Sequence, residues 1–83
     1  MVTPPAKAKF RTQIASDVVR DGLGVELLSE TGAILAEVFR WDAKHTVTFS
    51  AFAEDLPLEG VRMLIARALE RLDPFEDGTP LGT

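Results

Sequence analysis

The chain has no cysteine and only one histidine among its 83 residues. Without cysteine it can form neither a disulfide nor a thiolate-bound metal centre, and such a composition fits a reducing compartment. A single histidine also disfavours a conventional zinc or haem site within one chain. We therefore expect a cytoplasmic protein that carries no cofactor and no metal.

Long apolar runs are missing as well. No stretch approaches the ~20 residues that a membrane helix needs, and residues 1–9 lack the apolar core of a secretory signal. We expect no membrane segment. Proline, glycine and small residues gather at both ends, which predicts a flexible N-terminal arm at 1–9, one domain at 10–73 and a flexible C-terminal tail at 74–83.

Charge is distributed unevenly along the chain, whose formal net charge is −4. Residues 1–20 carry four basic side chains and one acidic one, a net of +3, whereas the rest carries five basic and twelve acidic ones, a net of −7. Nucleic-acid binding requires clustered cationic side chains. The acidic body therefore makes nucleic acid an improbable partner, and the basic arm is too sparse to reverse this.

An amphipathic helix is predicted at residues 57–72. At 100° per residue, the apolar positions fall within an arc of roughly 140°; they are Leu58, Val61, Leu64, Ile65, Ala68, Leu69 and Leu72. Pro57 suits the first turn, and Asp55 is a plausible cap or partner of the helix dipole. Asp73 precedes a proline, which pushes it out of the helical region and ends the helix.

Upstream of this helix the apolar period changes to two. Residues 24–29, 33–41 and 46–52 are predicted strands, with turns at 29–32 and 42–44. Residues 10–19 fit both a strand and a helical stripe, and their β-branched content favours a first strand. The predicted fold is α+β: an antiparallel meander of three or four strands, followed by one C-terminal amphipathic helix packed on one face of the sheet.

One helix can cover only one face of this meander. The candidates for the covered face alternate along the strands: Val25, Leu27, Ile34, Ala36, Val38, Val47, Phe49 and Ala51. The opposite face then carries Leu35, Phe39 and Trp41 beside Glu37, and exposed apolar patches of this kind usually mark an interaction surface. Either self-association covers this patch, or the N-terminal segment or the tail with Phe75 folds over it.

Asp42 and His45 form the best candidate for chemistry, because an Asp–His pair can orient an imidazole as a base. No nucleophile elbow or glycine-rich oxyanion turn surrounds the nearby hydroxyl residues. The simpler interpretation is a hairpin in which aspartate makes the turn and His45 begins the returning strand. Gly22 and Gly24 lack the rest of a dinucleotide motif, and Glu54, Asp55 and Glu59 suit a helix N-terminus. We predict no catalytic residue.

The sequence therefore favours a small non-catalytic protein-binding module, acting as a homodimer or as a subunit of an assembly. The predicted contact residues are Leu35, Phe39, Trp41 and His45. An alternative is an acidic inhibitor or immunity-type protein that binds a basic partner by charge complementarity. A less favoured alternative is a small enzyme or metal-binding protein that shares its site across a dimer interface. Whether a small-molecule ligand exists stays open.

Overall fold

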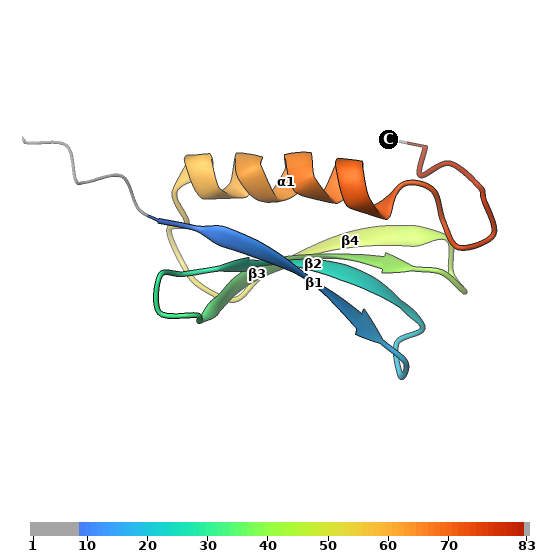
Figure 1. The fold of residues 1–83 in the computed structure, drawn as a ribbon, viewed down its shortest axis with the longest axis horizontal. Helices are drawn as coiled ribbons and strands as arrows, with labels where there is room; N and C mark the ends of the chain where they lie inside the picture. The colour runs from blue at the N-terminus through green and yellow to red at the C-terminus, as the bar shows by residue number, and fades with distance from the viewer. Residues whose placement is uncertain (1–8, 83) are drawn as a thin grey trace, which may run out of the picture.

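A computed structural model describes residues 9–82. Figure 1 shows the helix lying across one face of a twisted sheet. The strands are β1 (Arg11–Asp17), β2 (Gly22–Leu28), β3 (Ile34–Trp41) and β4 (Thr46–Ala51), and the helix is α1 (Leu58–Leu72). The predicted α+β fold is confirmed, and the ambiguous segment 10–19 contains strand β1 at Arg11–Asp17, followed by a turn. Most of the predicted N-terminal arm lies outside the described residues.

Each strand pairs antiparallel with the next one in the sequence, so the sheet order is β1-β2-β3-β4. Gly32 supplies the positive φ of the β2–β3 turn, as its sequence predicts. Asp21 and His45 also adopt positive φ, at 53° and 52°. His45 therefore belongs to the β3–β4 turn, and the prediction that it begins the returning strand is wrong.

The core lies between α1 and the middle of the sheet, since the helix packs over β2 and β3. Its buried members are Val25, Leu27, Ala36, Val38, Leu64, Ala68 and Leu72. Gly60 allows this close approach, because a Cβ there would lie 3.2 Å from Phe10 and 3.3 Å from Leu27. Pro57 is the N-cap and no side chain caps the helix, so Asp55 is not the cap, and its predicted alternative role as a partner of the helix dipole stays a prediction.

A register shift between Leu27 and Leu28 changes which residue at the start of β3 reaches the core. Ile34, predicted on the covered face, is exposed, whereas Leu35, predicted on the opposite face, packs against the core. Such an irregularity inserts one unpaired residue and reverses the alternation beyond it. Leu35 is therefore absent from the face that carries Phe39.

The helix leaves β4 largely uncovered. Val47, Phe49 and Ala51 share the helix side with Val38, as the β3–β4 register shows, yet Phe49 is 48% exposed. The physical reason is width: four strands at ~4.8 Å spacing exceed the ~10 Å diameter of one helix. Within residues 9–82, no helix is long and apolar enough to cross a membrane.

Candidate functional site

The side of the sheet opposite α1, here called the open face, carries Phe39 and Trp41 beside Glu37. Their rings meet edge to face with centroids 4.9 Å apart. The sequence predicts this grouping, because the three residues alternate along one strand. Phe39 is nevertheless only 1% exposed, so it does not form an accessible apolar patch.

Arg20, from the β1–β2 turn, covers Phe39. Its guanidinium carbon lies 3.8 Å from the centroid of the Phe39 ring. The same group donates to both carboxylate oxygens of Glu37, at 2.8 and 2.9 Å, and to Asp17 at 2.6 Å. The chain thus buries this aromatic ring under the side chain of its own Arg20.

Hydrogen bonds to Glu37 and then to Asp17 raise the pKa of Arg20 above its ordinary value. The Arg20 side chain in turn lowers the pKa of Asp17. Glu37 is 5% exposed and needs this partner, because a buried carboxylate without a counter-charge is costly. Arg20 therefore neutralises the charge of Glu37 and covers the ring of Phe39, so this cluster stabilises the fold.

Trp41 is the part of the predicted contact surface that stays partly exposed on the open face. Its indole Nε1 donates to the hydroxyl of Thr48 at 2.9 Å, and the Lys44 ammonium lies 4.8 Å from its ring. Polar partners thus surround Trp41. The structure brings Phe39 and Trp41 together, and it separates Leu35 and His45 from them.

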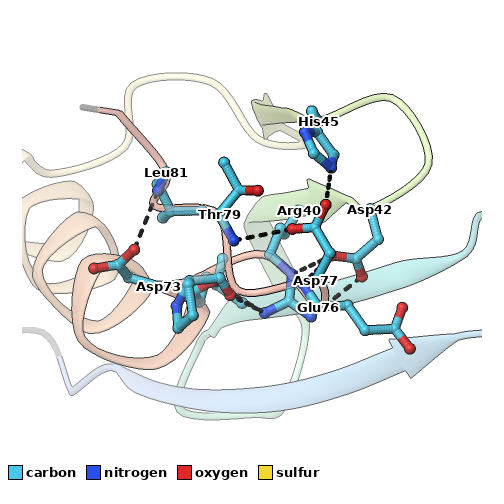
Figure 2. A network of polar contacts seen from close by, with 10 residues as sticks. Arg40, Asp42, His45, Asp73, Glu76, Asp77, Thr79 and Leu81 are labelled. Atoms are coloured by element: carbon cyan, nitrogen blue, oxygen red, sulfur yellow. Dashed lines mark hydrogen bonds and ion pairs between the residues drawn. The ribbon is translucent and has the colours of Figure 1, made fainter.

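His45 contacts the C-terminal segment instead, as Figure 2 shows. Its Nε2 lies 2.7 Å from Asp77 Oδ2, and its ring stacks on Phe75 with centroids 4.8 Å apart. Phe75 is buried, and the stacked ring of His45 covers part of it. Residues 75–77, within the segment predicted as a flexible tail, therefore lie against the β3–β4 turn.

Arg40 and Asp42 hold the rest of this segment in place (Figure 2). Arg40 donates from one nitrogen to the carbonyl oxygens of Leu72 and Pro74, both at 3.0 Å, and forms an ion pair with Asp42 at 2.9 Å. Asp42 accepts the backbone N–H of Glu76 at 2.9 Å. Arg40 thus binds the carbonyl end of α1, where a cation is favoured.

Carboxylates gather where this segment meets the hairpin turns. A shallow hollow of about 220 Å³ is lined by Asp21, Asp42, Ala43, Glu76 and Asp77. Burial acts to raise the pKa of Asp42, but the Glu76 N–H and the Arg40 guanidinium outweigh it and hold that pKa below its usual value. The N–H and hydroxyl of Thr79 lower the pKa of Asp77. The carboxylates of Asp42 and Asp77 are therefore both bound by groups of the chain itself.

Asp42 and His45 do not form a catalytic pair. Asp42 binds Arg40 and Glu76, and the imidazole of His45 binds Asp77, so neither orients the other. Across residues 9–82, no group of three or more side chains of the metal-ligating types is placed to hold an ion. The polar groups around the β3–β4 turn serve to attach the C-terminal segment.

An apolar groove runs between β4 and α1 on the helix side of the sheet. We call it the β4–α1 groove; it has a volume of about 270 Å³ and is lined by Val38, Val47, Thr48, Phe49, Ile65, Ala68, Leu69, Leu72 and Leu81. Ile65 and Leu69 are 45% and 49% exposed, comparable to Phe49. Three large apolar side chains therefore face one another across a groove that remains open to solvent.

Among residues 9–82, no strand pairs with the outer edge of β4, so the groove lies beside an unpaired sheet edge. β4 is the last strand in the sheet order. The Phe52 N–H donates to the Leu35 carbonyl at 2.8 Å, and these two residues come directly beyond Ala36 and Ala51, the last pair of the β3–β4 register. Because hydrogen-bonded pairs alternate along antiparallel strands, the backbone groups of Val47 and Phe49 point away from β3. They are free to bind another strand.

The sequence contains one signal for this groove that the alternation alone does not reveal. Leu58, Ile65 and Leu69 occupy one border of the predicted apolar arc, and all three are exposed. That arc of roughly 140° is wider than the contact a helix makes with a flat sheet.

Comparisons with family models, with curated proteins and with solved structures found no match.

Proposed function

We propose that this protein is a non-catalytic protein-binding module, and that its partner binds at the β4–α1 groove. The observation that carries the proposal is the coincidence of an open apolar groove with an unpaired strand edge. Large apolar side chains that gather on one surface typically mark an interaction site. An edge strand supplies main-chain donors and acceptors, while a neighbouring groove supplies the apolar contacts.

The half-exposed side chains define how much the groove can contribute to binding. Phe49, Ile65 and Leu69 each keep nearly half of their surface in water. Full burial of a large apolar side chain contributes about 1.5–3 kcal/mol, so burying the remaining half contributes about 1 kcal/mol each. A partner that covers all three gains about 3 kcal/mol, enough to decide specificity but not to give tight binding alone.

This proposal moves the contact surface away from Leu35, Phe39, Trp41 and His45. Leu35 packs in the core, Phe39 lies under Arg20, and His45 is engaged by the C-terminal segment. Only Trp41 keeps part of its surface accessible on the open face. The groove offers a larger apolar surface and does not require any of these contacts to break.

Affinity capture from a lysate of the source cell tests the proposal with matched variants. Leu69→Glu places a charge in the groove, and Val19→Glu places the same charge on the β1–β2 turn, where Val19 is 96% exposed. We expect Leu69→Glu to lose the partners that wild type and Val19→Glu retain, by at least tenfold in recovered amount. Equal recovery by all three would reject the groove. Selective loss with Trp41→Asp would point to the open face instead.

A further inference from the structure

We infer that the partner of the β4 edge is a second copy of this chain. The two β4 strands would pair antiparallel about a twofold axis and join two four-stranded sheets into one. This inference rests on the proposed function and names the partner that pairs with its strand edge. Twofold dimers are the commonest soluble oligomers, and an exposed sheet edge is a ready template for pairing.

The two edges of the sheet differ in the features that normally prevent such pairing. β1 has the sequence Arg-Thr-Gln-Ile-Ala-Ser-Asp, so its first and last residues are charged. β4 runs Thr-Val-Thr-Phe-Ser-Ala, with no charge and no proline. Natural proteins protect edge strands with charges, prolines or bulges. β4 has none of these, so it is the edge that can accept another strand.

The charges that flank β4 complement one another in an antiparallel pair. Lys44 precedes the strand, and Glu54 and Asp55 follow it. Antiparallel pairing places the beginning of one strand beside the end of the other. Lys44 of each copy then approaches the acidic pair of its partner, which offsets part of the repulsion between two chains of net charge −4.

The side-chain alternation of β4 restricts the register. Opposite residues in an antiparallel pair lie on the same face, so the apolar positions must meet one another. A register centred on Thr48 achieves this. It places Val47 opposite the partner's Phe49 on the helix side, and Thr46 opposite the partner's Ser50 on the open face. An aromatic residue opposite a β-branched one is a favourable cross-strand pair, and so is one hydroxyl residue opposite another.

The hydrogen-bonding pattern of β4 agrees with this register. Val47 and Phe49 present their N–H and C=O groups outward, so they form the hydrogen-bonded pairs of the new ladder. Thr48 then faces its own copy at a non-hydrogen-bonded position, where Cα atoms are about 4.5 Å apart. That separation lies within the range of about 4.4–6.8 Å that a disulfide spans.

The area available indicates a dimer of modest affinity. Phe49 and Phe52 are 48% and 60% exposed, which leaves about 200 Å² of aromatic surface at the edge. A strand of this length adds an edge of about 20 Å. Stable interfaces bury about 800 Å² per partner, so this contact falls at the low end. We expect a dissociation constant on the order of 10–100 µM.

This arrangement places both α1 helices on one side of the joined sheet. Each helix lies over β2 and β3, about two strand spacings from the twofold axis, so the helix axes are about 20 Å apart. Directly packed helices are 8–10 Å apart. The two β4–α1 grooves therefore face each other across the axis. The two copies of His45 lie about 20 Å apart, too far to share a metal ion.

The absence of cysteine makes a direct test possible. Thr48→Cys introduces a single thiol at the predicted axis, and Gln13→Cys introduces one at an exposed position on β1, as the matched control. In a glutathione redox buffer at 100 µM protein, we expect Thr48→Cys to form a linked dimer at least tenfold faster than Gln13→Cys. Equal rates would overturn the inference. Matching urea midpoints confirm that both variants are folded.

Sedimentation equilibrium of the wild-type chain supplies a second, independent measurement. We expect the apparent mass to rise from 9.1 kDa toward twice that value between 5 and 500 µM protein. A mass of 9.1 kDa throughout would overturn the inference. A monomer whose captured partners still depend on Leu69 would overturn the inference and leave the proposed function standing. A dimer whose captured partners ignore Leu69 would support the inference and reject the proposed function.

Discussion

Replacing Arg20 with methionine tests whether this residue stabilises the open face. The substitution keeps an apolar stem over Phe39 and removes the guanidinium that binds Glu37 at 2.8 and 2.9 Å. The Glu37 side chain, only 6% exposed, then loses its counter-charge. The main effect of Arg20→Met is thus an uncompensated carboxylate within the sheet.

The expected size of this effect follows from the exposure of the two partners. Removing one partner of a fully buried ion pair costs about 3–5 kcal/mol. The Arg20 side chain is 34% exposed, so water reaches Glu37 once the guanidinium is gone. We therefore expect a loss of about 2–3 kcal/mol in the free energy of unfolding. For a domain of this size, that lowers the melting temperature by about 10–20 °C.

Urea unfolding followed by tryptophan fluorescence measures this loss directly, because Trp41 is the only tryptophan in the chain. Arg67→Met serves as the control. Arg67 forms an exposed pair with Glu70 at 3.5 Å, and its removal should cost less than about 0.5 kcal/mol. Combining Arg20→Met with Glu37→Leu should restore most of the lost stability, since the carboxylate leaves with its partner.

Two results would refute this reasoning. If Arg20→Met costs no more than Arg67→Met, the pair with Glu37 does not stabilise the fold. If the double variant is as unstable as Arg20→Met alone, the loss comes from packing over Phe39 rather than from an unpaired charge.

Two further predictions concern the backbone and the pH. Gly22→Ala should lower the free energy of unfolding by about 2–3 kcal/mol, because the added Cβ would lie 1.9 Å from the Arg40 carbonyl oxygen. Urea unfolding measures this loss, and a loss below about 1 kcal/mol would contradict the close approach. Asp42 has a lowered pKa in the folded chain, so its contribution to stability is present above its unfolded value of about 3.9 and is lost as the pH falls through the lower folded value. Between pH 5 and 3, Asp42→Asn should therefore lose less stability than wild type, and parallel curves for the two proteins would count against this explanation.

Much of the fold was predictable because its local signals agree with the final packing. The helix at 57–72 has a clear apolar period and ends at Asp73 in the structure as in the prediction. The alternation in β3 places Phe39 and Trp41 on one face. Each of these features depends on residues close together in the sequence, where periodicity is informative.

What the sequence did not reveal depends on contacts between distant residues. The shift between Leu27 and Leu28 exchanges Ile34 and Leu35, and no residue type there marks a bulge. Burial of Phe39 requires Arg20, which the β1–β2 turn brings to the same face. Alternation alone could not show that the patch was already covered within the chain.

The groove was missed for a different reason. The periodicity identifies its members as apolar, but the same pattern places Phe49 and Leu69 on a covered face that one helix is too narrow to cover. Comparing the width of the sheet with that of the helix would have predicted an uncovered strand. It could not have shown which edge stays uncovered, because that depends on where the helix crosses the sheet.

The C-terminal segment links the groove to the β3–β4 turn. Leu81 lines the groove, and its N–H donates to Asp73 at 3.1 Å, while Glu76 and Asp77 bind the turn residues Asp42 and His45. We therefore expect binding of the proposed partner at the groove to be coupled to attachment of the segment, and such coupling is reciprocal. If the partner packs against Leu81, hydrogen exchange should slow throughout residues 75–81, and loosening the segment should weaken the partner by the same free energy.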